Sequence, residues 1–152
     1  MKTLKMLLSI GLSIFLITTI AIAMEYGTSE EAKAMLQKAV KAVKMDKVAA
    51  LNDFTNGNMM YKEKDLYVFC FDPETGEIRA HGAKASMVGK NVKTLKDKTG
   101  FPLGEELFKN AKNGEFRQVD YMWPRPGETE QSAKSSYVTR VEGLACGVGY
   151  YK

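Results

Sequence analysis

Aromatic and cationic side chains gather in two neighbouring segments with a pattern typical of a binding wall. Residues 116–123 alternate between apolar and polar side chains, a polar turn with two prolines and a glycine follows, and residues 133–141 resume the alternation. This arrangement predicts an antiparallel hairpin. A period of two places Tyr121 and Trp123, the only tryptophan of the chain, on one face of the first strand. Two aromatics on a strand are more often core than site, so this pattern alone leaves both roles open.

The second strand carries the run K-S-S-Y, in which Lys134 and Tyr137 have opposite parity. One of the two can reach the aromatic wall directly, and the other needs a bulge or the end of the strand. A pocket for a carboxylate needs a cation or hydrogen-bond donors together with an apolar wall around a short tail. A solvated lysine at a sheet edge is the alternative for Lys134. We predict donors from Lys134, Tyr121, Tyr137 and His81, and a wall from Trp123, Tyr67 and Phe69.

The sequence favours binding over catalysis. His81 is the only histidine, and no G-x-S-x-G segment accompanies it, so a serine hydrolase site has little support. One histidine and two distant cysteines are too few ligands for zinc. No haem-attachment motif or glycine-rich phosphate loop is present. We therefore expect no enzyme activity, no metal and no cofactor.

The first 23 residues have the composition of an export signal. Lys2 and Lys5 precede an apolar stretch that ends at the small-x-small sequence Ala21-Ile22-Ala23. The apolar stretch is short for a membrane span, which needs about 20 residues, so we favour cleavage after Ala23 over an uncleaved anchor. The remainder, residues 24–152, has the length of one domain.

The charges of the chain are interspersed. The formal net charge is +4, and two of the lysines lie in the predicted leader. An exported protein with such a charge distribution is not expected to bind nucleic acid.

A long helix and a sheet are expected to position these residues. Thr28 and Glu31 form a capping box, and an apolar stripe continues to about residue 55 with an interruption at Asp46. The apolar run 66–71 predicts a central strand buried on both faces. Further predicted elements are a strand at 77–81, an irregular connection at 82–99, a short helix at 103–112 and a last strand at 144–151. The order predicts an α+β fold with one antiparallel sheet.

Five segments in this order resemble the single Cache domain, the PAS-like extracytoplasmic sensor module of bacterial chemoreceptors and sensor kinases. They are Y-V-F-C-F-D-P-E-T-G-E-I-R-A-H-G, V-G-K-N, V-D-Y-M-W-P-R-P, K-S-S-Y-V and G-V-G-Y-Y. The resemblance implies a five-stranded antiparallel sheet with a long N-terminal helix along one side. It also implies a pocket between the sheet and the irregular connection, often for small organic acids such as acetate, propionate or pyruvate.

The sequence stops at Lys152, directly after the last predicted strand. We therefore expect a free-standing periplasmic Cache protein that binds a short carboxylate, with Lys134 and a tyrosine hydroxyl at the carboxylate and Trp123 over its alkyl end. The alternative is an interaction subunit that has lost its ligand and docks on a membrane receptor or histidine kinase. The ligand and the oligomeric state stay open at this point.

Cys70 and Cys146 lie on the first and last strands of the predicted domain, which are neighbours in a Cache-like sheet. An oxidising compartment allows a disulfide, but strand alternation does not settle whether both face the same side. Buried free cysteines are also common in strands. The sequence leaves both states open.

Cleavage after Ala23 makes a direct prediction. Intact-mass analysis of protein from the periplasmic fraction should show a chain that begins at Met24. A mass that retains residues 1–23, found in the membrane fraction, would identify an uncleaved anchor instead.

Overall fold

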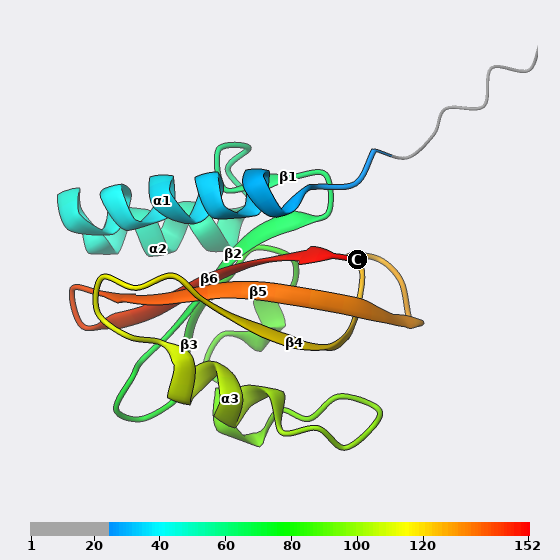
Figure 1. Cartoon of the computed structure of the whole chain (residues 1–152). Coiled ribbons are helices and arrows are strands. Elements are labelled where there is room, and N and C mark those ends of the chain that lie inside the picture. Colours follow the sequence, from blue (N-terminus) through cyan, green and yellow to red (C-terminus); the bar gives the residue numbers. More distant parts are fainter. Residues whose placement is uncertain (1–24) are drawn as a thin grey trace, which may run out of the picture.

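The computed structural model describes residues 25–152, and in it an antiparallel sheet separates two helices from a long irregular connection (Figure 1). The predicted leader and its cleavage site lie outside the described residues. The elements in order are α1 Ser29–Met45, α2 Lys47–Asn56, β1 Lys62–Glu63, β2 Leu66–Phe71, β3 Ile78–His81, η1 Ala85–Met87, η2 Val92–Thr94, α3 Leu103–Asn110, β4 Arg117–Pro124, β5 Gln131–Val141 and β6 Leu144–Tyr151.

The predicted long helix is divided into α1 and α2 at Asp46. Thr28 begins α1 with the expected capping box, in which its side chain accepts from the Glu31 N–H and Glu31 accepts from the Thr28 N–H. Asp46 adopts an extended conformation, and its carboxylate accepts a hydrogen bond of 3.0 Å from the Ala49 N–H, which begins α2. Gly57 ends α2 with a left-handed φ of 74°. The predicted interruption is confirmed, and its cause is a side chain that caps a new helix.

The sheet has the order β1-β2-β6-β5-β4, and β3 pairs with β2 on the edge that β1 also uses. All pairings are antiparallel. The α+β class is confirmed. Six strands are present where five were expected, because the two-residue strand β1 was not anticipated from sequence. A pairing of two residues has too few alternating positions to leave a pattern in the sequence.

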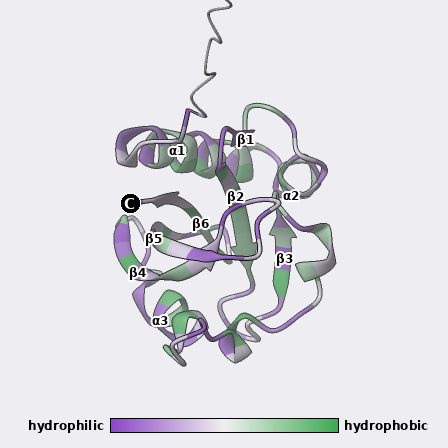
Figure 2. Cartoon of the chain, turned by 90° about the vertical axis from the view of Figure 1, so that its right-hand side faces the viewer, coloured by the Kyte–Doolittle hydropathy of each residue, from purple (hydrophilic) through white to green (hydrophobic). Residues whose placement is uncertain are grey.

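The sheet is buried on both faces. Every residue of β2 is buried, as expected for a central strand with an unbroken apolar run, and its ribbon is largely hydrophobic in colour (Figure 2). Alternate residues of β2 pack into two different hydrophobic cores, one on each face of the sheet. Leu66, Val68 and Cys70 pack towards α1 and α2, whereas Tyr67 and Phe69 pack towards the connection that contains η2 and α3.

Cys70 and Cys146 face each other across the β2–β6 pair and form a disulfide. Both side chains are fully buried on the helix-covered face of the sheet. The bond links positions 76 residues apart in the sequence. It therefore joins two neighbouring strands of the sheet. It also closes a long loop in the unfolded chain, which lowers the conformational entropy of the unfolded state.

No helix in residues 25–152 has the length and apolarity that a membrane span requires.

The disulfide predicts a measurable stability difference. Reduction of the wild-type protein should lower its free energy of unfolding by roughly 2–4 kcal/mol, measured by urea unfolding with and without reductant. The double variant Cys70→Ala/Cys146→Ala is the control, and reductant should leave its unfolding curve unchanged. Two reactive thiols in the unreduced, urea-unfolded wild type would contradict the disulfide.

Candidate functional site

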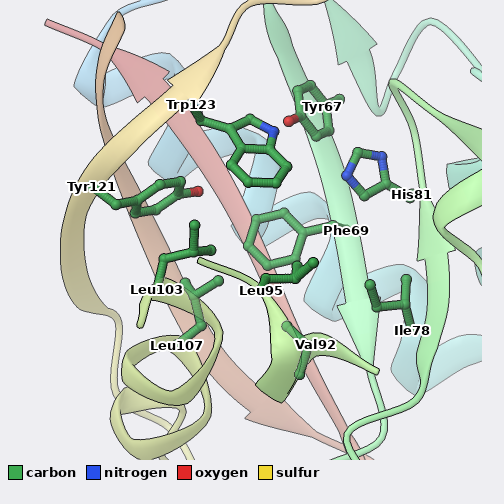
Figure 3. A pocket seen from close by; sticks show the side chains of 10 residues that line it. All are labelled: Tyr67, Phe69, Ile78, His81, Val92, Leu95, Leu103, Leu107, Tyr121 and Trp123. Carbon is green, nitrogen blue, oxygen red and sulfur yellow. The ribbon is translucent and has the colours of Figure 1, made fainter. Parts of the chain in front are cut away.

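An apolar pocket lies between the sheet and the connection, on the face opposite α1 (Figure 3). Its volume is about 30 Å³, small but above the roughly 10–15 Å³ of such space that one water molecule needs. β2, β3 and β4 supply one wall, and η2, the residue after it and α3 supply the other. The lining residues are Tyr67, Phe69, Ile78, His81, Val92, Leu95, Leu103, Leu107, Tyr121 and Trp123.

Polar groups gather at one end of this inner pocket. In Figure 3 the indole nitrogen of Trp123 points towards the Tyr67 hydroxyl, and His81 lies beside Tyr67. The Tyr121 hydroxyl also points inward, and it hydrogen-bonds to Ser136 Oγ at 2.6 Å. The opposite end is apolar and is formed by Ile78, Val92, Leu103 and Leu107. The pocket therefore suits a very small molecule with one polar and one apolar end.

Lys134 lies behind the polar end of the pocket. Its side chain is 1% exposed, and Nζ donates to the Tyr67 hydroxyl at 2.9 Å and to the Tyr151 hydroxyl at 3.3 Å. Nζ also lies 4.2 and 4.6 Å from the centres of the Tyr67 and Tyr151 rings. Its partners are thus two neutral hydroxyls and two aromatic faces.

A glycine makes room for this lysine. A Cβ at Gly149 would lie 2.3 Å from both Cε of Lys134 and Oγ of Ser136, far closer than real Cβ contacts. At Gly147 a Cβ would lie 2.5 Å from the Phe69 ring. The two glycines of β6 share the pocket face because they lie two residues apart on one strand, and the space beside them holds side chains of the site.

Burial determines which of these groups carry charge. It lowers the pKa of Lys134 to about 7, and the carboxylate of Asp65 opposes this only in part. Burial also raises the pKa of Tyr67, which keeps the hydroxyl protonated. The pKa of His81 is lowered to about 4, first by burial and then by the charges of Lys134 and Lys84. His81 Nδ1 accepts from the Lys84 N–H at 3.1 Å, which places the imidazole proton on Nε2.

An arginine joins the site to the segment before α1. Arg125 lies between the rings of Tyr26 and Tyr151, with its guanidinium carbon 4.4 and 4.7 Å from their centres. Its Nε lies 3.5 Å from Asp65 Oδ2, and Asp65 Oδ1 accepts from the Gly27 N–H at 2.7 Å. The Tyr151 hydroxyl, which accepts from Lys134, donates to the Pro124 carbonyl. The ammonium of Lys134 is thus held by a network that reaches the first residues described.

The structure brings together six of the seven residues proposed from sequence. Five of them line the inner pocket, and Lys134 lies behind Tyr67 rather than on the pocket surface. Lys134 is buried, so the alternative of a solvated edge lysine is wrong.

Tyr137 lies apart from the other six. It faces α1, where its hydroxyl bonds to Ser29 Oγ at 2.9 Å and its ring packs near Tyr150. The reason is strand parity: β5 is regular along its whole pairing with β4, so residues three apart face opposite sides. The prediction that Tyr137 shares the pocket with Lys134 is wrong.

Sequence reasoning missed the apolar end of the pocket and the network behind Lys134. Val92 and Leu95 are three residues apart, and Leu103 and Leu107 are four apart, which is the spacing of single helical turns. This signal was present inside the segment expected to be irregular or only briefly helical. Tyr151, by contrast, is the penultimate residue, and nothing local marks it as a partner of Lys134.

This architecture is that of an extracytoplasmic sensor domain, and comparison with known proteins names the family. The sequence signature described as single Cache domain 2 matches residues 2–151, so the chain belongs to that family.

Chemotaxis receptors are among the similar proteins. The methyl-accepting chemotaxis protein McpP of Pseudomonas putida is 30% identical over 73 residues, which is 47% of this chain but only 13% of that receptor. The structure of a methyl-accepting chemotaxis protein from Vibrio parahaemolyticus has a TM-score of 0.67 and 27% identity, with 80% of this chain and 86% of that chain covered. A Cache chemosensory domain that recognises carboxylic acids has a TM-score of 0.63 and 24% identity, with 81% of this chain and 92% of that one covered.

The lowered pKa of Lys134 predicts how stability depends on pH. An unfolded chain binds a proton at this lysine below the ordinary value of 10.5, whereas the folded protein does so only below about 7. Between these values the unfolded state holds more protons, so the contribution of Lys134 to the free energy of unfolding rises with pH, by at most about 1.4 kcal/mol per pH unit. In urea unfolding from pH 6 to 9, the stability of wild type relative to Lys134→Met should therefore increase.

An exposed lysine provides the control for this measurement. Lys38 lies on the exposed side of α1, and Lys38→Met should follow the wild-type pH profile. Wild-type and Lys134→Met curves that stay parallel over this range would show that burial does not lower the pKa of Lys134.

Proposed function

We propose that this domain is a sensor module that binds a short carboxylate in the inner pocket. The observation that carries the proposal is the buried ammonium of Lys134, whose hydrogen-bond partners within residues 25–152 are two neutral hydroxyls. A buried charge that is only partly compensated is unfavourable, and a ligand carboxylate at the polar end of the pocket would complete the compensation. Ligand binding then raises the pKa of Lys134 and stabilises its charged form.

Tyr67 connects the lysine to the ligand. Its hydroxyl oxygen accepts from Lys134 Nζ, which leaves its own proton free to be donated to a carboxylate in the pocket. The Trp123 N–H and the His81 Nε2–H lie at the same end and supply further donors. This arrangement supports a role for Trp123 at the carboxylate in place of the expected role over the alkyl end, which we propose is covered by Val92, Leu103 and Leu107.

The small volume of the pocket restricts the ligand class. A space of about 30 Å³ with leucine and valine at its far end suits acids with a short alkyl tail, and side chains move apart to admit them. Recognition of carboxylic acids by a Cache domain of the same fold supports this class. A second charged group in the tail has no partner at the apolar end, so acetate and propionate are preferred over dicarboxylates.

The family and the predicted leader support the cellular setting that we propose. Single Cache domains are extracytoplasmic sensors, and we place this one in the periplasm, where a membrane receptor or sensor kinase is the partner that reads the ligand state. The similarity to chemotaxis receptors supports such a partner.

Thermal denaturation with a panel of acetate, propionate, lactate, pyruvate and short amino acids tests the proposal. The protein is first unfolded and refolded to remove any acid acquired during expression. A ligand at about 100 times its dissociation constant stabilises the fold by about 2.7 kcal/mol. For a domain of this size the melting temperature then rises on the order of 10 °C.

Two variants locate the site. Lys134→Met removes the charge, and Tyr67→Phe removes the hydroxyl but keeps the ring. Each should weaken binding by about tenfold or more, since a hydrogen bond to a charged group contributes roughly 1.5–3 kcal/mol. Lys38→Met on α1 is the control and should bind as wild type does. A wild type that responds to no acid would favour the interaction subunit, and a Lys134→Met variant with the wild-type response would place the ligand elsewhere.

A further inference from the structure

A second, much larger cavity adjoins the inner pocket. This outer cleft has a volume of about 630 Å³ and lies between the turn after β4 and the connection that contains η1 and η2. Four side chains line both cavities and form a partition between them: Tyr67, His81, Leu95 and Trp123. Three of these four surround the polar end of the inner pocket, so the outer cleft leads to the end proposed for the carboxylate.

The charged lining of the outer cleft is mostly cationic. Lys84, Lys90, Lys96 and Arg125 contribute positive charge, and Glu128 is the one carboxylate among the lining residues. Arg125 is engaged with Asp65 and with Ser132 Oγ. Within residues 25–152, the ammonium groups of the three lysines form no hydrogen bond or ion pair. Their charge is therefore available to an anion that approaches from solvent.

The backbone holds these lysines next to the partition. The Lys84 N–H donates to His81 Nδ1, which ties Lys84 to a partition residue. The Lys90 carbonyl accepts from the Ile78 N–H at 2.8 Å, which fixes the loop after η1 on β3. Lys96 directly follows Leu95, which is itself part of the partition. Two backbone hydrogen bonds and one chain neighbour thus position the three lysines around the outer cleft.

We propose that the outer cleft is the entrance to the inner pocket and that Lys84, Lys90 and Lys96 draw small anions into it. This inference rests on the proposed function, because it concerns how the same ligand reaches its site. A cleft lined by one sign of charge between low-dielectric walls raises the local concentration of the opposite charge and speeds association by 10-fold to 1,000-fold. The bound carboxylate lies beyond the partition, where the lysines make no direct contact with it, so they act mainly on the approach.

This separation predicts a kinetic signature. Removal of the three charges lowers the association rate constant and leaves the dissociation rate constant unchanged. The salt dependence of association also weakens when they are removed, since exposed charges are screened over a Debye length of about 10 Å at 0.1 M. Trp123, the only tryptophan of the chain, borders both cavities and reports arrival of the ligand by its fluorescence.

The test uses stopped-flow tryptophan fluorescence with propionate as the probe, at low and at high ionic strength. The variant Lys84→Gln/Lys90→Gln/Lys96→Gln should associate about fivefold or more slowly than wild type at low salt, with dissociation changed less than about twofold. Its dissociation constant, measured by equilibrium titration, should rise by the same factor as association falls. The matched control is Lys38→Gln/Lys41→Gln/Lys44→Gln on α1, across the sheet from the cleft, which removes the same charge and should associate as wild type does.

Three results would contradict the proposal that the outer cleft is the entrance. Equal slowing in both triple variants would assign the effect to net charge. Faster dissociation with unchanged association would show that the lysines contact the bound acid. Wild-type rates in the cleft variant would show that its charges play no part in entry. A wild type that propionate does not stabilise at all overturns the proposed function itself, a result distinct from these three.

Discussion

The burial of one ammonium group is the constraint on which the pocket side of this domain depends. Lys134 is 1% exposed, and its charge is stabilised by two tyrosine hydroxyls and the faces of their rings. This requires Gly149 beneath its side chain, since any larger residue would occupy the same space. It also requires Tyr67 and Tyr151 to converge from β2 and β6, the two strands that the disulfide joins. A cation held in this way is only partly compensated, and that incompleteness gives an anion a reason to bind.

The sheet keeps stability and recognition on separate faces. The helix side has a continuous apolar core and the buried disulfide, so it can stabilise the fold without any contribution from a ligand. The other side contains a small cavity, a buried cation and several tyrosine hydroxyls. Period-two alternation lets each strand serve both purposes. Tyr137 and Lys134 show the division within one strand, because the first packs on α1 and the second supports the pocket.

In the function proposed here, selectivity arises at two positions along one route. The inner pocket would discriminate by size and by an apolar end that leaves a second charge without a partner. The outer cleft would discriminate by the sign of charge before the ligand arrives. The partition between them contains groups that are kept neutral by burial, including a histidine whose pKa of about 4 excludes protonation near neutral pH. The network from Lys134 through Tyr151 and Arg125 to Tyr26 then connects the state of the pocket with the segment that precedes α1.

Patterns local in the sequence determined the elements, and the tertiary structure decided which of their side chains meet. The capping box at Thr28, the break at Asp46, the buried strand 66–71 and the hairpin were predictable, because caps, turns and alternation act over a few residues. Alternation also placed Lys134 and Tyr137 on opposite faces, but it did not say which face would hold the pocket. Register decided that Cys70 lies opposite Cys146 and that Tyr151 lies opposite Lys134. Such pairings join residues that are far apart along the chain, and their energies depend on packing across the sheet, which leaves no periodic trace in the sequence.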